Sequence, residues 1–306
     1  MPLLGAHVST SGGLWTAFDR AEQLGCEATQ IFTKSARQWK APPFKPADVE
    51  RFRQRAAETG IVVVSHASYL INLASPHPEI WFKSVEAHQI EMERCRTLGI
   101  PYLVMHPGAH TGSGYLAGIQ RVAEAINREH AEGDDSAMLL LEITAGTGTS
   151  LGWELAHFEG ILELVNHPER VGICFDTCHA VGAGWDIISR DGYEGVMEQF
   201  DARLGLDRIR CFHLNDSQHT LGARRDRHTH IGFGSCSLEP FRFVLNDARF
   251  DSVPMILETP KDDDLAQDVV NLKVLRALLQ NAEEPVTAET LELFWEGVSR
   301  TEGKDE

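Results

Sequence analysis

The chain alternates between short apolar runs and longer stretches in which apolar residues recur at helical spacing. The runs are rich in β-branched residues, and each is broken by a glycine, serine, threonine, asparagine or proline. Short apolar runs of this kind are typical of buried strands, and apolar positions three and four residues apart are typical of amphipathic helices. The alternation therefore predicts a parallel sheet whose strands are connected by helices.

The apolar runs predict eight strands. Two lie at residues 3–9 and 28–33, and the other six end at residues 66, 106, 142, 176, 213 and 258. Helices are predicted between them, at residues 12–25, 46–60, 79–99, 115–130, 154–166, 193–204, 238–247 and 265–280. Regular alternation around eight strands favours a closed α/β TIM barrel over the alternative, an open doubly wound sheet.

Six of the predicted strands end in a residue that can bind a metal ion. These residues are His66 in VVVSHAS, His106 in YLVMHPG, Glu142 in MLLLEIT, Asp176 in GICFDTCH, His213 in RCFHLND and Glu258 in PMILETP. Because the carboxyl ends of barrel strands meet at one face, we expect these side chains to form a ring there. An open sheet would not bring six strand ends to one point.

Three further candidate ligands lie in predicted loops beside this ring: His179, Asp226 and His228. The D-x-H spacing places Asp226 and His228 on the same side of an extended loop. Together with the ring they make nine ligands, more than one ion with four to six positions can use. The sequence thus predicts two or three divalent cations. Nitrogen and carboxylate ligands without thiolate favour catalytic zinc, with manganese as the alternative.

The length of 306 residues and the 42% hydrophobic content suit one large domain with a substantial core. We expect a barrel domain at residues 1–282. The pattern then changes, and residues 283–306 are expected to form an acidic C-terminal extension with one helix around Leu291, Phe294, Trp295 and Val298.

The formal net charge of −17 argues at first against a nucleic-acid partner. However, the extension alone carries eight acidic and two basic residues, and four other carboxylates are candidate ligands. Basic residues gather in two loops beside the ring, namely Lys34, Arg37, Lys40 and Lys45 in one and Arg224, Arg225 and Arg227 in the other. The net charge therefore does not exclude a nucleic-acid partner.

The six cysteines include no C-x-x-C pair, and several lie inside apolar runs, which indicates buried reduced thiols. The N-terminus has neither the basic region nor the apolar region of a secretory signal, and no apolar run approaches a membrane span. We therefore expect a cytoplasmic protein without a membrane partner.

Nine segments, in this order along the chain, carry a family resemblance: G-A-H-V-S, F-T-K-x-x-R-Q-W, H-x-S-Y-L-I-N-L, H-P-G, L-E-x-T-A-G-x-G, D-T-C-H, H-L-N-D-S, D-R-H and L-E-T-P. From about residue 3 to 280 the chain resembles the endonuclease IV family of apurinic/apyrimidinic endonucleases. The resemblance implies a monomeric eight-stranded α/β barrel. It also implies hydrolysis of double-stranded DNA 5′ to an abasic site, which leaves 3′-hydroxyl and 5′-deoxyribose phosphate ends.

The resemblance also implies three zinc ions that activate a water as hydroxide, with manganese as an alternative at one site. The implied ligands are His66, His106 and Glu142 for the first ion; Glu142, Asp176, His213 and Glu258 for the second; and His179, Asp226 and His228 for the third. Glu142 would bridge two ions. Glu258 would also orient the attacking water, so Glu142 and Glu258 are the expected catalytic residues.

By the same resemblance, Arg37 and the pair Tyr69 and Leu70 would enter the DNA stack where the abasic nucleotide is flipped out. The alternative is that Tyr69 and Leu70 only pack their loop against the barrel. Three other polar residues near strand ends either support the ligands or contact substrate: His7, His110 and Asn215.

The chain departs from the family pattern at a few positions, all outside the candidate ligands: Ser35, Ala36, Ile143, Thr147 and Phe233. Phe233, in H-I-G-F-G, stands where a more polar residue is expected. Two other functions stay open. A barrel sugar isomerase or epimerase would need only one or two metal ions, and a nucleic-acid binding module would need no catalysis.

Overall fold

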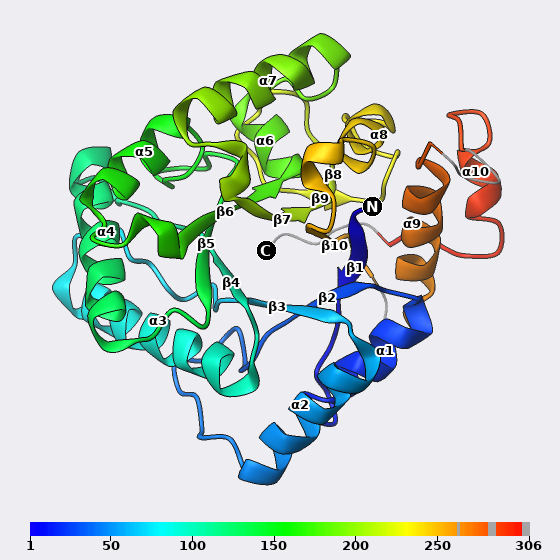
Figure 1. Ribbon diagram of the computed structural model, residues 1–306. Helices are drawn as coiled ribbons and strands as arrows, with labels where there is room; N and C mark the ends of the chain where they lie inside the picture. Colours follow the sequence, from blue (N-terminus) through cyan, green and yellow to red (C-terminus); the bar gives the residue numbers. More distant parts are fainter. Residues whose placement is uncertain (262–263, 281–285, 302–306) are drawn as a thin grey trace.

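The computed structural model describes residues 1–261, 264–280 and 286–301. Eight parallel strands form a closed barrel in the order β1-β10-β7-β6-β5-β4-β3-β2 (Figure 1). The strands are β1 (Leu3–His7), β2 (Ala28–Ile31), β3 (Val62–His66), β4 (Tyr102–Met105), β5 (Met138–Glu142), β6 (Val171–Asp176), β7 (Ile209–His213) and β10 (Pro254–Leu257). The predicted TIM barrel is confirmed.

Helices surround the barrel at each predicted position (Figure 1). They are α1 (Thr16–Leu24), α2 (Pro46–Thr59), α3 (Pro78–Leu98), α4 (Tyr115–Glu132), α5 (Leu155–Leu164), α7 (Arg190–Arg203), α8 (Glu239–Leu245) and α9 (Ala266–Ala277). Short 3-10 turns lead into three strands: η1 (Pro168–Arg170), η2 (Leu206–Arg208) and η3 (Ala248–Phe250). The first three helices end at left-handed glycines, as predicted: Gly25, Gly60 and Gly99.

Two small elements were not predicted. Residues directly after β6 form a short helix, α6 (Thr177–Ala183), and the loop after β7 contains an antiparallel pair, β8 (Asp216–Ser217) and β9 (His228–Thr229). His179 therefore lies on a helix and His228 on a strand, so the expectation that both lie in loops is wrong. Asp176 caps α6, because its carboxylate accepts a hydrogen bond from the His179 N–H at 2.7 Å.

Seven strands each contribute one residue to a separate buried cluster inside the barrel: Ala28, Val64, Val104, Leu140, Cys174, Cys211 and Ile256. Successive side chains of a strand point to opposite faces, so the residue two positions further along points inward again. Those next residues are Gln30, His66, His106, Glu142, Asp176, His213 and Glu258. The strand period thus places all six ring residues in one polar layer directly above an apolar layer.

A bulge keeps β7 in step with its neighbours. Ile173 pairs with Ile209, but Cys174 pairs with Cys211, so Arg210 is an extra residue in β7. The exposed Arg210 takes up the extra position. As a result Asp176 and His213 lie opposite each other at the ends of β6 and β7.

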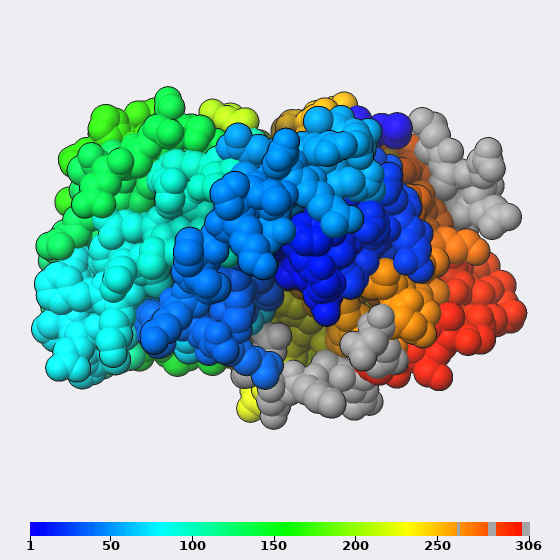
Figure 2. All heavy atoms as spheres, turned by 90° about the horizontal axis from the view of Figure 1, so that it is seen from below, coloured from blue at the N-terminus to red at the C-terminus, as the bar shows by residue number. Residues whose placement is uncertain are grey.

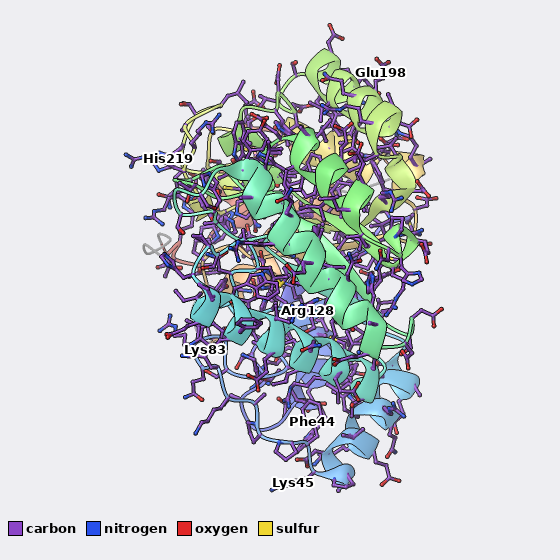
Figure 3. The ribbon with its side chains drawn as sticks, turned by 90° about the vertical axis from the view of Figure 1, so that its left-hand side faces the viewer. Phe44, Lys45, Lys83, Arg128, Glu198 and His219 are labelled. Atoms are coloured by element: carbon purple, nitrogen blue, oxygen red, sulfur yellow. The ribbon has the colours of Figure 1, made fainter. Side chains whose placement is uncertain are left out.

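The outer helices bury their apolar sides against the barrel and expose charged residues. Figure 3 shows this surface from the side, with the exposed Lys83, Arg128 and Glu198 on α3, α4 and α7. On another face, shown in Figure 2, the α9 residues (orange) lie next to the N-terminal helices (blue), which closes the ring. A short helix, α10 (Leu291–Phe294), lies outside α9 (Figure 1).

The six cysteines are free and buried, as expected for reduced thiols. Among the described residues, none of the helices is both long and apolar enough to cross a membrane. Residues 302–306, the end of the predicted acidic extension, lie outside the described part of the chain.

Candidate metal centre

The nine predicted ligand residues lie together in three groups. Within each group, one ligand atom per residue lies within 4.8 Å of the others. The groups are His66, His106 and Glu142; then Glu142, Asp176, His213 and Glu258; then His179, Asp226 and His228. Because Glu142 belongs to two groups, these two are adjacent.

In the first group, both histidines face one oxygen of Glu142. Its Oε2 is 3.2 Å from Nε2 of His66 and 2.9 Å from Nε2 of His106. The other ring nitrogen of His66, Nδ1, lies 2.8 Å from the Ala67 carbonyl, which can only accept a hydrogen bond. Nδ1 therefore carries the hydrogen and the lone pair of Nε2 points into the group.

In the second group, His213 presents Nδ1 to the carboxylates. This nitrogen is 2.9 Å from Oε1 of Glu142 and 3.0 Å from Oε2 of Glu258. Its Nε2 donates to Oε1 of Gln30 at 2.8 Å, and Nε2 of Gln30 donates to Glu258 at 2.6 Å. Gln30 thus orients one imidazole and one carboxylate.

In the third group, two histidines face the carboxylate of Asp226. Nε2 of His179 is 3.0 Å from Oδ2, and Nε2 of His228 is 3.3 Å from Oδ1. Their Nδ1 atoms point at backbone carbonyls instead, of Ile143 at 2.8 Å and of Glu258 at 3.1 Å. Both Nε2 atoms are buried and make no hydrogen bond to the described residues.

This donor set fits divalent metal ions. A metal-binding histidine usually donates its other ring hydrogen to a carbonyl or carboxylate, which fixes the tautomer. His66, His179 and His228 all have that arrangement, and each directs Nε2 at a carboxylate. Imidazole and carboxylate ligands suit zinc and, with more oxygen ligands, manganese.

Electrostatic attraction acts between the carboxylates and the histidines of the cluster. Burial raises the pKa of Glu142, but His106 and His213 outweigh this effect and hold it well below its ordinary value. Burial likewise raises the pKa of Glu258, and His213 lowers it well below its ordinary value. The carboxylates therefore stay ionised and require positive charge beside them, which bound cations would supply.

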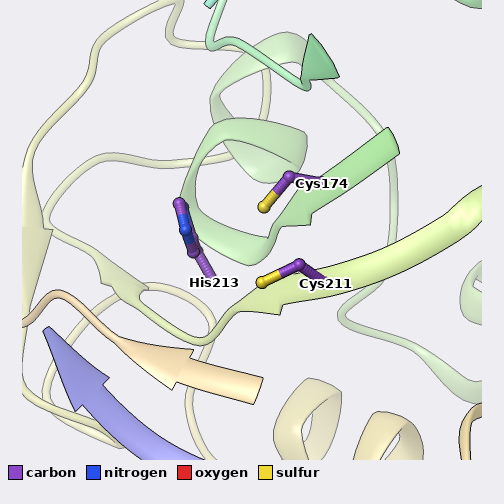
Figure 4. Close-up of side chains that lie close together, drawn as sticks. All are labelled: Cys174, Cys211 and His213. Atoms are coloured by element: carbon purple, nitrogen blue, oxygen red, sulfur yellow. The ribbon is translucent and has the colours of Figure 1, made fainter. Parts of the chain in front are cut away.

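Two thiols lie below the ring. Figure 4 shows Cys174 on β6 and Cys211 on β7 close to His213, and the three could form a further ligand group. Burial raises the pKa of Cys174 well above its ordinary value, so its thiol stays protonated. Nδ1 of His213 lies 2.9 Å from Oε1 of Glu142, so this nitrogen belongs to the second ligand group. The centre therefore offers nitrogen and oxygen ligands.

All the candidate ligands except Asp176 and His213 line one cavity of about 1300 Å³. Arg37, Tyr69 and Leu70, the predicted DNA-contacting residues, line the same cavity. Tyr69 is 53% exposed, and its ring packs edge-on against Phe32 at 5.6 Å. The Tyr69 ring therefore packs against Phe32 while part of the side chain stays open to solvent.

Comparison with known proteins identifies the protein family of this chain. Residues 18–289 match the family described as xylose isomerase-like TIM barrel. A protein of Chloroflexus aurantiacus, named probable endonuclease 4, is 52% identical over 285 residues, which cover 92% of this chain and 100% of that protein. The chain belongs to the endonuclease IV family.

Solved structures agree with this membership. The crystal structure of endonuclease IV from Thermus thermophilus matches with a TM-score of 0.80 and 36% identity, over 90% of this chain and 98% of that one. A D-psicose 3-epimerase from Clostridium cellulolyticum H10 matches with a TM-score of 0.62 but only 14% identity, over 95% of each chain. The epimerase therefore shares the fold alone.

The predicted resemblance to the endonuclease IV family is thus confirmed. Gln30 was not among the predicted site residues, although it lies two residues after the apolar Ala28 in β2. Asn215 was expected either to support the ligands or to contact substrate. Asn215 is buried and hydrogen bonds to Asp176 and to the backbone of Glu258, so within this family member it supports ligands.

Lys34, one of the basic residues predicted beside the ring, lines the same cavity as the candidate ligands. Its side chain is only 2% exposed and lies 3.3 Å from Glu91. It stabilises the loop after β2. Arg37 lies in the same loop but is exposed, so its charge is accessible to solvent, unlike that of Lys34.

Proposed function

We propose that this protein hydrolyses the phosphodiester bond 5′ to an abasic site in double-stranded DNA. The products would be 3′-hydroxyl and 5′-deoxyribose phosphate ends. The observation that carries the proposal is that three adjacent nitrogen and oxygen ligand groups each contribute residues to one cavity, which Arg37, Tyr69 and Leu70 also line. Family membership supports the same reaction.

Three divalent ions, chiefly zinc, would be held by the three groups, with manganese as an alternative at one site. Such ions supply Lewis acidity, which polarises a phosphate and acidifies water at neutral pH. Glu142 would link the first two groups, since its two oxygens face different histidines: Oε2 faces His66 and His106, and Oε1 faces His213.

Glu258 would orient the attacking water. Its Oε1 accepts from Gln30 at 2.6 Å and its Oε2 lies 3.0 Å from His213, so both oxygens have fixed positions. Unlike Glu142, it is only partly buried, and it lines the cavity. A carboxylate that is fixed but reachable can hold a water in line with a phosphate.

Recognition of the abasic site would come from Arg37, Tyr69 and Leu70. The unstacking that a flipped nucleotide requires costs a few kcal/mol, and side chains that fill the vacated space offset it. Arg37 is exposed and Tyr69 is 53% exposed, and they lie on the loops after β2 and β3, so they can reach the stack together.

Elemental analysis combined with a nicking assay tests the proposal. A duplex with one abasic site should be cut on its 5′ side, and an intact duplex of the same sequence should not. The purified protein should contain about three ions per chain, and prolonged chelation should abolish both cutting and metal content. One ion per chain with sugar epimerase activity would support the isomerase alternative, and DNA binding without cutting in excess zinc would support a binding module.

A further inference from the structure

A C-terminal segment, residues 286–301, packs beside the candidate metal centre although the family match ends at residue 289. Three of its apolar residues are nearly fully buried: Val286 is 1%, Leu291 5% and Trp295 4% exposed. The segment begins against α8, where Arg242 donates a hydrogen bond to the Val286 carbonyl at 3.2 Å. It ends at Thr301, which lines the cavity of the metal centre.

The segment covers one side of the loop that follows β9. The Trp295 ring lies 4.5 Å from the ring of His230, and the Arg300 guanidinium lies 3.9 Å over the ring of Phe233. Nε2 of His230 donates to the Thr301 carbonyl at 3.1 Å. Stacking and hydrogen bonding thus fix both ends of residues 230–233 from the outside.

The opposite side of the same loop is held by the barrel. The buried carboxylate of Asp216 accepts from the N–H groups of Gly232 and Gly234 at 3.0 and 2.9 Å. Asn271 accepts from the Ile231 N–H at 3.1 Å and donates to Nδ1 of His230 at 2.9 Å. The loop is therefore held on one side by β8 and α9 and on the other side by the C-terminal segment.

The contact between segment and loop is close. Gly232 has a φ of +86°, and a Cβ there would lie 2.7 Å from Cδ2 of Leu291. Both the backbone conformation and the approach of Leu291 require glycine. Phe233, the departure from the family pattern, is the aromatic surface on which Arg300 lies, so the segment accounts for an apolar residue at this position.

We propose that residues 286–301 position the third ligand group, with Trp295 acting through His230 on His228. His228 lies two residues before His230, and its Nδ1 is 3.1 Å from the Glu258 carbonyl, so a shift of the loop moves a candidate ligand directly. The inference rests on the proposed function only for the presence of a third ion. The segment would thus act as a positioning element for the candidate ligand His228.

Trp295→Ala tests the inference, with Trp295→Phe as the conservative variant and Leu293→Ala, at a residue 61% exposed, as the control. Affinity for each ion is measured by titrating zinc into the chelated protein and following it by calorimetry. We expect one of the three ions to lose about 10- to 100-fold in affinity in Trp295→Ala, the scale of the loss when a residue that supports a metal ligand is removed. The other two ions should be unchanged, Trp295→Phe should restore most of the loss, and Leu293→Ala should match the parent.

Turnover gives a second readout. Trp295→Ala should lower kcat on abasic duplex with little change in KM, because the segment acts on the centre and not on the DNA contacts. Arg300→Ala, which removes the contact with Phe233 together with the ion pair to Glu292, should show a smaller effect in the same direction and serves if Trp295→Ala does not fold. A lower melting temperature with unchanged zinc affinity and kcat would overturn the inference. A parent with fewer than three ions would overturn the proposed function and the inference together, whereas a three-ion parent with unaltered variants overturns the inference alone.

Discussion

Asn215 donates a hydrogen bond from Nδ2 to Oδ2 of Asp176 at 2.7 Å. Its Oδ1 accepts from the backbone N–H of Glu258 at 2.8 Å, so one buried amide joins two candidate ligands from β6 and the end of β10. A side chain in this position fixes the carboxylate of Asp176 and the backbone of Glu258 relative to each other. Its removal should therefore affect metal binding and leave the barrel intact.

Asn215→Ala should weaken binding of the second ion by about 10- to 100-fold, the usual cost of losing a hydrogen-bond partner of a metal ligand. Zinc titration measured by calorimetry checks the result. The control is Asn166→Ala, because Asn166 is exposed and distant from the centre in the fold. Unchanged zinc affinity in Asn215→Ala would mean that Asp176 and Glu258 hold their positions without the amide.

Glu258→Gln should reduce cleavage of abasic duplex by at least about a hundredfold, because it removes a charge beside His213 while keeping the volume. DNA binding should stay largely intact. Single-turnover cutting and equilibrium binding on the same duplex separate the two effects. Glu163→Gln, at an exposed position of α5, is the matched control. Near-normal cutting by Glu258→Gln would assign this carboxylate a structural role.

Arg37→Ala combined with Tyr69→Ala should keep full metal content and reduce discrimination between abasic and intact duplex. The lost contacts form only when the helix is opened, and the affinity that remains should be phosphate attraction with strong salt dependence. Competition binding at two salt concentrations measures both properties. Tyr115→Ala is a matched control, since Tyr115 is also 53% exposed but does not line the cavity. A double variant with the parent's discrimination would return Tyr69 to a packing role.

His88→Met should make the protein less sensitive to acid. Neither ring nitrogen of the buried His88 hydrogen bonds to another described residue, and burial, reinforced by Arg96, lowers its pKa to about 3. At neutral pH the ring is uncharged in both states, so it contributes no pH dependence. As the pH falls below about 6.5, the unfolded chain binds a proton that the folded chain refuses, and stability falls.

The free energy of unfolding by urea, measured between about pH 7.5 and 4.5, checks this prediction. The parent should lose up to about 1.4 kcal/mol per pH unit more than His88→Met over this window, the contribution of one proton. The exposed His77→Met should follow the parent. Parallel curves for parent and His88→Met would show that His88 accepts its proton in the folded state.

The periodicity of the chain was enough to predict the barrel and most of its helices. Strands with period two and helices that end at glycine are local patterns, so each can be recognised without knowing its neighbours. The same period explains why residues 66, 106, 142, 176, 213 and 258 were recognisable as one set: each lies two positions after an inward-facing residue of its strand. The family resemblance rests on the same segments.

Only the tertiary structure decided how these elements are supported. The helix α6 is seven residues long, too short for a periodic signal, and its start depends on the carboxylate of Asp176. Gln30 was not predicted, and Asn215 was left between two roles, because their contacts with His213 and Asp176 join strands that are far apart in sequence. The contact between the C-terminal segment and the loop near the centre likewise depends on Trp295 and His230, which are adjacent in space but distant in sequence. Local patterns determine which residues form each element, whereas contacts between distant segments depend on closure of the whole barrel.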